Sequence, residues 1–253
     1  MIEARNLQQS LVRERYRDFG AAQVSLLLRP SGHVGGDLVG FFPISDTQIC
    51  LFSIDVSGHG VASALMTARL AAYLSGSSVE QNLALCRDED GNVTARSPAI
   101  AAIHLNDLIQ KEMETEIYFT MALGHFDMVT GLVTLVQCGH PKAVIQRADG
   151  DVEFCGDGGL PIGLIVGAEW SDYTIQLAPG DRLMLLSDGI TECPGRNGDM
   201  LEEDGLIQIL HRNARLRGSA FFETLIWELT KFAGDKDFPD DVSGVLLEYS
   251  GPG

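Results

Sequence analysis

The sequence is poor in basic residues and has no long uncharged apolar run. Eighteen Lys and Arg stand against thirty-five Asp and Glu, which gives a formal net charge of −17. Binding to a nucleic-acid backbone or to an anionic membrane surface requires a basic footprint, so we expect neither partner. No apolar run approaches the roughly 18 residues of a membrane-spanning helix.

Cysteine pairing is also absent from the sequence. The five cysteines are widely spread and contain no Cys-x-x-Cys pair, so no disulfide framework, zinc knuckle or dithiol redox centre is indicated. We expect buried, reduced thiols. Met1 to Arg5 carry mixed charge and no apolar stretch, so we expect no secretory signal at this end and a cytoplasmic location.

Enough apolar material is present for one large domain. Hydrophobic residues make up 45% of the 253 residues, and we place that domain at 21–250. Residues 3–19 have helical periodicity and no Gly or Pro before Gly20, which predicts a helix, with 1–20 as a linker. Residues 75–97 are polar and aperiodic, and we expect a flexible insertion there.

The remaining pattern predicts strands in series and helices in pairs. The strand runs are 23–28, 39–44, 48–55, 118–126, 130–137, 142–148, 151–155, 172–177, 181–187 and 242–249. Helices are expected after Gly60, from Ser97-Pro98, and near 203–214 and 219–233. Asp149-Gly150 favours a tight hairpin, so neighbouring strands should be antiparallel. This order argues against a doubly wound parallel sheet and favours two antiparallel sheets covered by helices, an α+β fold.

Four aspartate-containing segments stand out at the ends of apolar runs or in glycine turns. They are Gly35-Gly36-Asp37, Ile54-Asp55-Val56-Ser57-Gly58-His59-Gly60, Leu186-Ser187-Asp188-Gly189 and Pro239-Asp240-Asp241-Val242. A half-buried carboxylate needs a positive partner, and no basic residue lies beside these segments. Carboxylate and carbonyl oxygens suit hard cations such as Mg²⁺ or Mn²⁺. Each segment alone could equally be an ordinary turn, so composition and spacing lead only to a candidate oxygen-ligand metal site.

A family resemblance extends this interpretation. Its motifs are Val34-Gly35-Gly36-Asp37, Asp55-Val56-Ser57-Gly58-His59-Gly60, Cys138-Gly139-His140-Pro141, Gly159-Leu160-Pro161-Ile162-Gly163, Ser187-Asp188-Gly189-Ile190-Thr191-Glu192 and Asp240-Asp241-Val242-Ser243. In this order the set resembles the metal-dependent protein serine/threonine phosphatases (protein phosphatase 2C-like), in the bacterial SpoIIE/RsbU-type branch. The resemblance runs from about residue 23 to 249 and implies a four-layer αββα sandwich.

The resemblance also implies the ligands of two Mn²⁺ or Mg²⁺ ions. Asp37 and Asp55 would bridge the ions, with the Val56 backbone carbonyl as a further ligand, and Asp188 and Asp240 would hold the other ion. A water activated by the ions would attack the phosphorus of a phosphoserine or phosphothreonine, so no protein nucleophile is needed. Asp37 and Asp55 would act in catalysis through that bridged water.

Three assignments within these motifs stay open. Asp241 competes with Asp240 for one ligand position, and we place the ligand on Asp240, with Asp241 as its solvated neighbour. His59 is a candidate general acid, although a structural role at the helix start explains it as well. His140, between Gly139 and Pro141, is interpreted as a turn residue.

Two positions depart from the family pattern. Many bacterial members carry an acidic residue at the position of Gly40, so an accessory carboxylate is missing here. Ser243-Gly244 replaces the more common Thr followed by an apolar residue, and glycine weakens a strand interior. Neither change removes an inferred ligand.

The resulting hypothesis is a Mn²⁺- or Mg²⁺-dependent protein serine/threonine phosphatase that acts on a bacterial regulatory protein such as an anti-sigma factor antagonist. An upstream receiver or sensor domain is expected, and a homodimer through residues 3–19 stays open. Two alternatives remain: a catalytically weak phosphatase-like output module of a response regulator, and a hydrolase of small phosphate esters.

Overall fold

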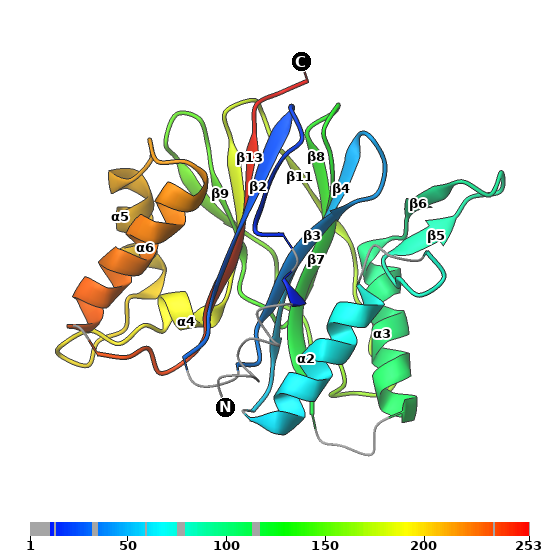
Figure 1. Ribbon diagram of the computed structural model, residues 1–253, viewed down its shortest axis with the longest axis horizontal. Coiled ribbons are helices and arrows are strands. Elements are labelled where there is room, and N and C mark those ends of the chain that lie inside the picture. Colours follow the sequence, from blue (N-terminus) through cyan, green and yellow to red (C-terminus); the bar gives the residue numbers. More distant parts are fainter. Residues whose placement is uncertain are drawn as a thin grey trace.

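Two antiparallel sheets lie face to face at the centre of the molecule (Figure 1). The structure is a computed structural model that describes residues 11–12, 14–31, 35–58, 60–74, 79–112, 117–234 and 236–252. Over these residues one sheet has the order β1 (Tyr16–Asp18), β2 (Ala22–Arg29), β13 (Val242–Tyr249), β12 (Arg182–Leu186), β9 (Ala143–Gln146) and β10 (Val152–Cys155). The other has the order β11 (Tyr173–Gln176), β8 (Leu132–Cys138), β7 (Phe119–Asp127), β4 (Gln48–Val56) and β3 (Leu38–Pro43).

Helices cover the outer face of each sheet. Helices α5 (Glu202–Arg212) and α6 (Gly218–Ala233) pack on the sheet that contains β13, after the short α4 (Asp188–Thr191). Helices α2 (Val61–Tyr73) and α3 (Pro98–Glu112) pack on the sheet that contains β4. The layers are therefore helix, sheet, sheet and helix, which confirms the predicted αββα sandwich. None of the helices in the described part of the chain is both long and apolar enough to cross a bilayer.

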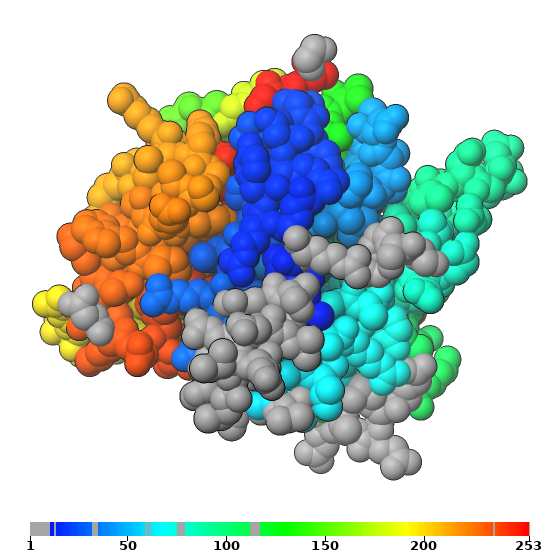
Figure 2. All heavy atoms as spheres, in the orientation of Figure 1, coloured from blue at the N-terminus to red at the C-terminus, as the bar shows by residue number. Residues whose placement is uncertain are grey.

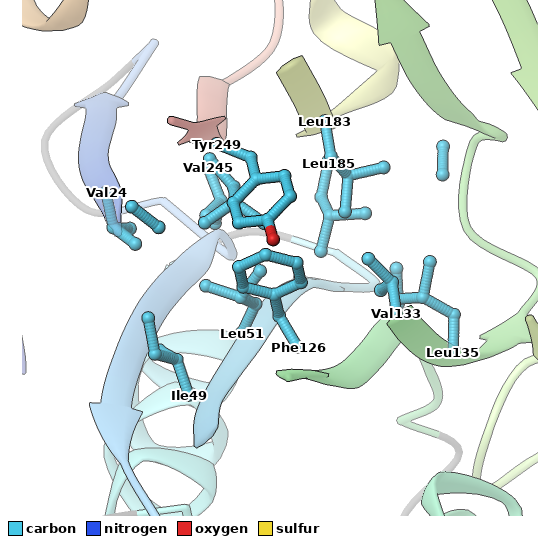
Figure 3. Close-up of a cluster of buried hydrophobic side chains, with 14 of the residues drawn as sticks. Val24, Ile49, Leu51, Phe126, Val133, Leu135, Leu183, Leu185, Val245 and Tyr249 are labelled. Carbon is cyan, nitrogen blue, oxygen red and sulfur yellow. The ribbon is translucent and has the colours of Figure 1, made fainter. Parts of the chain in front are cut away.

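One of the apolar clusters lies between the two sheets. Val24 and Val245 from one sheet meet Leu51 and Leu135 from the other (Figure 3). The rings of Phe126 and Tyr249 meet edge to face, with centroids 5.1 Å apart. Every residue of β13 is buried, because this central strand is covered by the partner sheet on one face and by helices on the other. This core fixes the two sheets relative to each other, and thus fixes the strand ends that carry the aspartates.

The predicted strand runs coincide with β2–β4 and β7–β13, and the predicted helices coincide with α2, α3, α5 and α6. The predicted start of α3 is also confirmed, because the Ser97 hydroxyl accepts the N–H of Ile100. Ser97 and the N–H of Ala99 further donate to the Asp172 carboxylate, at 2.6 Å and 2.7 Å. Both pairs of helices, α2 with α3 and α5 with α6, are thus where the periodicity predicts them.

The predicted helix over 3–19 is wrong in its last turn. Residues 1–10 and 13 lie outside the described part, whereas Tyr16–Asp18 form β1, which pairs antiparallel with β2. Arg17 forms an ion pair with Glu14 at 2.6 Å and lies over the ring of Phe19, 5.5 Å from its centroid. The sequence did not reveal β1, because a strand of three residues has too few apolar positions to show its own period. The helical periodicity of the preceding residues therefore dominated the prediction.

The insertion predicted to be flexible contains a hairpin. Strands β5 (Leu85–Arg87) and β6 (Val93–Ala95) pair antiparallel and project from the body of the molecule (Figure 2). The Asp88 carboxylate closes the turn by accepting the N–H groups of Asp90 and Asn92. Strands of three residues are too short to show periodicity, so side-chain turn chemistry was the only available signal. Residues 75–78 lie outside the described part.

Candidate functional site

Strand register brings the four aspartate segments to one end of the sandwich. Leu38 lies opposite Ile54 in the β3–β4 pair, so Asp37 and Asp55 are cross-strand neighbours. Leu186 lies opposite Gly244 in the β12–β13 pair, so Asp188 leaves its strand beside the segment that enters β13 through Asp240 and Asp241. One pair of carboxylates therefore comes from each sheet.

Asp241 connects the two sheets at this end. Its Oδ1 accepts the backbone N–H and the hydroxyl of Ser31, at 2.8 Å and 3.1 Å. Its Oδ2 accepts the backbone N–H of Asp37, at 3.3 Å. The side chain is 4% exposed, so the prediction that Asp241 is a solvated neighbour of the site is wrong. Asp241 instead holds the segments that follow β2 and precede β3, and so positions Asp37.

Asp240 has a different environment from Asp241. It is exposed, and its carboxylate accepts the N–H of Asp241 at 2.7 Å. Protein donors thus bind both oxygens of Asp241, whereas among the described residues Asp240 has a hydrogen bond at only one oxygen. Asp240 is also close enough to raise the pKa values of Asp37, Asp55 and Asp188. This contrast supports Asp240 over Asp241 as the metal ligand, as the order of the motif suggests.

Ser187 and Gly189 fix the position of Asp188. The hydroxyl of Ser187 accepts the N–H of Ser243 at 2.9 Å, and the N–H of Ser187 donates to the Ser243 carbonyl at 3.1 Å. A Cβ at Gly189 would lie 2.1 Å from the carbonyl oxygen of Asp241. Glycine is therefore required for the turn that carries Asp188 to pass against the turn that carries Asp240 and Asp241.

The Gly35-Gly36 pair makes a cradle of oxygen atoms. A Cβ at Gly35 would overlap the Asp241 carboxylate, 1.7 Å from Oδ2. A Cβ at Gly36 would lie 2.4 Å from the Val56 carbonyl oxygen and 3.3 Å from Oδ1 of Asp55. The Gly36 carbonyl itself accepts the Thr67 hydroxyl at 3.0 Å. The two glycines therefore let carboxylate and carbonyl oxygens approach the backbone just before Asp37.

The carboxylates raise one another's pKa values. Burial is the largest cause at Asp37, followed by the charges of Asp55 and Asp241, and its pKa lies well above the usual value. Burial and the charges of Asp188 and Asp240 raise the pKa of Asp55 to about 7. Burial and the charge of Asp240 raise the pKa of Asp188. Positive charge at this position would stabilise all of them in the ionised form.

The donor set fits a hard divalent cation, although no ligand shell is preformed. Asp55, Asp188 and Asp240 form no ion pair with a Lys or Arg in the described ranges. The two atoms nearest the cradle at Gly36 are oxygens, the Val56 carbonyl and Oδ1 of Asp55, and Mg²⁺ and Mn²⁺ prefer oxygen ligands. Within the same ranges, no three His, Cys, Asp or Glu side chains are grouped closely enough to hold a metal as they stand. The ligand assignment therefore remains a proposal.

Packing explains both departures from the family pattern. Gly40 lies opposite Phe52 in the β3–β4 register, and a Cβ at Gly40 would lie 2.3 Å from the Phe52 ring. The ring occupies the space beside the backbone of Gly40, so a larger residue at this position would require the ring to move. At Gly244 a Cβ would lie 2.7 Å from a methyl group of Leu186. Both glycines accommodate large neighbours in the sheets.

Two histidines from the motifs have different outcomes. His59 lies outside the described residues, so its assignment as general acid stays a prediction. His140 lies in the connection between β8 and β9, where the sequence places a turn, and it is buried: it is 2% exposed and its Nδ1 lies 2.9 Å from the Thr120 hydroxyl. Thr120 is the cross-strand neighbour of Asp55 in the β4–β7 pair. His140 is therefore part of the wall beside the carboxylates, which its position in a Gly-His-Pro turn did not reveal.

Burial lowers the pKa of His140 to about 3, which predicts a loss of stability in mild acid. The unfolded chain binds a proton near pH 6.5 that the folded chain does not bind, so stability falls as the pH drops through that value. From pH 7 to pH 5, urea unfolding should show wild type losing about 2 kcal/mol more than His140→Gln. The exposed His211→Gln serves as the control and should follow wild type. Parallel curves for wild type and His140→Gln would contradict the buried neutral state.

A pocket of ≈ 470 Å³ lies beside the turn that carries Asp188. Ser187, which precedes Asp188, belongs to its wall, together with Thr191, His140 and Lys142. Asp37, Asp55, Asp188 and Asp240 are not among its lining residues.

The family model of Stage II sporulation protein E (SpoIIE) matches residues 45–250, which is most of the chain. The chain belongs to the SpoIIE family. This confirms the resemblance read from the motifs. One curated relative is the phosphoserine phosphatase RsbP of Bacillus subtilis. This SpoIIE-family chain is 25% identical to RsbP over 194 residues, which are 76% of this chain and 43% of RsbP.

A second curated relative is the phosphoserine phosphatase RsbU of Bacillus subtilis. It is 23% identical over 246 residues, 96% of this chain and 68% of RsbU. The SpoIIE-family chain therefore spans less than half the length of RsbP and about two thirds of RsbU.

Solved structures confirm the fold of the SpoIIE-family chain. The SiaA-PP2C domain of Pseudomonas aeruginosa superposes with a TM-score of 0.81 at 18% identity, covering 98% of this chain and 94% of that one. The PP2C phosphatase domain of SpoIIE from Bacillus subtilis, with a fragment of its regulatory domain, gives a TM-score of 0.73 at 20% identity, covering 94% and 63%. The protein phosphatase 2C-like sandwich expected from the sequence is thus present.

Proposed function

We propose that this chain is a Mn²⁺- or Mg²⁺-dependent protein serine/threonine phosphatase that hydrolyses phosphoserine on a bacterial regulatory protein of the anti-sigma factor antagonist type. The observation that carries the proposal is the set of carboxylates from both sheets that raise one another's pKa values beside the Gly36 cradle. Membership of the SpoIIE family supports the reaction class, and two relatives bear the name phosphoserine phosphatase.

The proposed ligands follow from these positions. Asp37 and Asp55 would hold both ions, with the Val56 carbonyl as a further ligand, and Asp188 and Asp240 would hold the second ion, as the family motifs imply. When bound, the ions supply an activated water and offset the charge of the phosphoryl oxygens. Two divalent ions add about four positive charges, so the acidic protein need not repel a phosphoserine at this point.

The chain's own residues position this set. Asp241 holds the amide of Asp37, and Ser187 fixes the turn that carries Asp188. The hydroxyl of Thr67 holds the Gly36 carbonyl next to Val56. The Ser57 hydroxyl accepts the N–H of Tyr118 at 3.1 Å, which holds the turn after Asp55. The protein's part in catalysis is therefore to orient carboxylates and substrate.

The proposal includes the setting of the domain. Residues 1–20 would link an upstream receiver or sensor domain to the phosphatase domain at 21–250, in a cytoplasmic protein, and a homodimer through this leader stays open. Against the alternative of a catalytically weak output module, all four proposed ligand residues are present in the chain.

Removal and return of metal tests the proposed cofactor. We expect p-nitrophenyl phosphate hydrolysis to be lost after treatment with a chelator and to return with Mn²⁺ or Mg²⁺, but not with Zn²⁺ alone, because the site has only oxygen donors. Activity restored by Zn²⁺ alone would contradict the donor set. No hydrolysis under any condition would favour the output module. A higher kcat/KM on free phosphoserine than on a phosphoprotein would favour the small-ester hydrolase.

A further inference from the structure

An uncharged and exposed apolar loop lies near the carboxylates. Residues 158–168 contain no charged side chain, although charged residues make up 21% of the chain. Four aliphatic side chains of this loop face solvent: Leu160 is 41% exposed, Leu164 51%, Ile165 45% and Val166 78%. Exposed apolar residues gathered in one segment of an acidic protein mark a candidate interaction surface.

Polar side chains hold this apolar loop in place. Asn106 is 1% exposed, and its amide group accepts the N–H of Gly163 at 2.8 Å and donates to the Ile165 carbonyl at 3.0 Å. Gln110 also donates to the Gly163 carbonyl, and the indole N–H of Trp170 donates to the Leu160 carbonyl at 2.9 Å. A loop held at this many points presents its apolar side chains in a fixed arrangement, which lowers the entropic cost of binding.

The apolar loop is continuous with the proposed active site. Ile162 exchanges two backbone hydrogen bonds with Phe119, at 2.8 Å and 3.0 Å. Tyr118 precedes Phe119 in the chain, and its carbonyl accepts the N–H of Ser57 at 2.9 Å. Ser57 follows Asp55 by two residues. From strand spacing, this path places the exposed side chains roughly 10–15 Å from the carboxylates, the reach of about four extended residues.

We propose that Leu160, Leu164, Ile165 and Val166 form a docking surface for apolar side chains of the phosphoprotein substrate, about four to six residues from the phosphoserine. The proposal rests on the proposed phosphatase function and names a determinant of its substrate specificity. A substrate segment whose phosphoserine lies at the carboxylates passes over this surface. The surface has no charged side chain, so it neither attracts nor repels charged groups of the substrate. Affinity there comes from burial of aliphatic groups.

A second copy of this chain is a poorer occupant. Four partly exposed aliphatic side chains offer on the order of 300–400 Å², whereas a stable interface buries about 800 Å² on each partner. A short apolar contact that adds to binding at the phosphate is consistent with that small area.

The test uses two phosphoserine peptides and p-nitrophenyl phosphate, with Mn²⁺ present. One peptide has leucines four to six residues on both sides of the phosphoserine, and the other has asparagines there. Wild type should show a kcat/KM about tenfold or more higher on the leucine peptide. In Leu164→Asp/Val166→Asp that ratio should fall to about one, with p-nitrophenyl phosphate hydrolysis within about twofold of wild type.

Val129→Asp is the matched control. Val129 is 57% exposed and follows the far end of β7, whereas Phe119 begins that strand next to the apolar loop. This variant should keep the wild-type peptide ratio. Thermal unfolding checks that each variant folds. If the double variant does not fold, Val166→Ser replaces it, and this variant should reduce the ratio of kcat/KM on the two peptides partly.

The outcomes separate this proposal from the proposed function. If wild type hydrolyses p-nitrophenyl phosphate but shows no peptide preference, or if the double variant keeps the preference, the docking surface is refuted and the phosphatase stands. If wild type hydrolyses none of the three substrates, both fail. A molecular mass in solution that halves in the double variant would assign the loop to self-association and overturn the proposal.

Discussion

Asp55→Asn is expected to lower Mn²⁺-dependent hydrolysis of p-nitrophenyl phosphate by about 10³-fold or more. Asp55 is a proposed bridging ligand, and asparagine keeps its size while removing the charge that a shared cation needs. The same substitution should raise the melting temperature in chelator by about 2–6 °C, because one of several mutually repelling carboxylates is removed. A loss of function together with a gain in stability distinguishes a charge-based site from a structural residue.

Asp46→Asn is the control for this experiment. Asp46 is exposed in the turn between β3 and β4, at the opposite end of β4 from Asp55. The change in net charge is identical, but neither activity nor melting temperature should move. An Asp55→Asn protein with wild-type activity, or with a lower melting temperature in chelator, would contradict the account of the carboxylates.

Gly36→Ala is expected to lower both stability and activity. The new Cβ would lie 2.4 Å from the Val56 carbonyl oxygen, a backbone atom that cannot rotate away. We expect a loss of about 2–4 kcal/mol in the free energy of unfolding. The shift would also displace Val56 and Asp55, and displacement by about 1 Å at a catalytic site costs about 10²-fold in rate. Urea unfolding and kcat per folded molecule measure the two effects.

Gly124→Ala separates the two effects. Gly124 lies in the middle of β7, and a Cβ there would lie 2.4 Å from the Thr134 carbonyl oxygen, the same contact as at Gly36. Its stability loss should be similar, with kcat per folded molecule within about threefold of wild type. Equal losses of kcat in both variants would show that activity follows stability, and that the Gly36 cradle has no special role.

The larger elements could be predicted because each carries its own signal. A strand such as β4 is a long apolar run ending at Asp55, and α3 begins at a Ser-Pro cap, so local chemistry fixes both. The β5–β6 hairpin and β1 lack such signals, because strands of three residues depend on turn contacts and on neighbouring strands. Tertiary context decides such segments.

The site was predictable only in part, for the same reason. The aspartates are visible as motif residues, but their convergence depends on the register of β3 with β4 and of β12 with β13. The role of Asp241 depends on contacts with Ser31 and Asp37, about two hundred residues away in the chain. Spacing alone does not report a bond between such distant residues, so Asp241 looked like a solvated neighbour of Asp240.

The ligand set is tested most directly by anomalous scattering from crystals soaked in Mn²⁺. We expect two manganese peaks that share Asp37 and Asp55, one of them also near the Val56 carbonyl and the other at Asp188 and Asp240, with the Asp241 carboxylate still bound to Ser31. Absence of manganese from these oxygens, or a peak on Asp241 with Asp240 free in solvent, would contradict it.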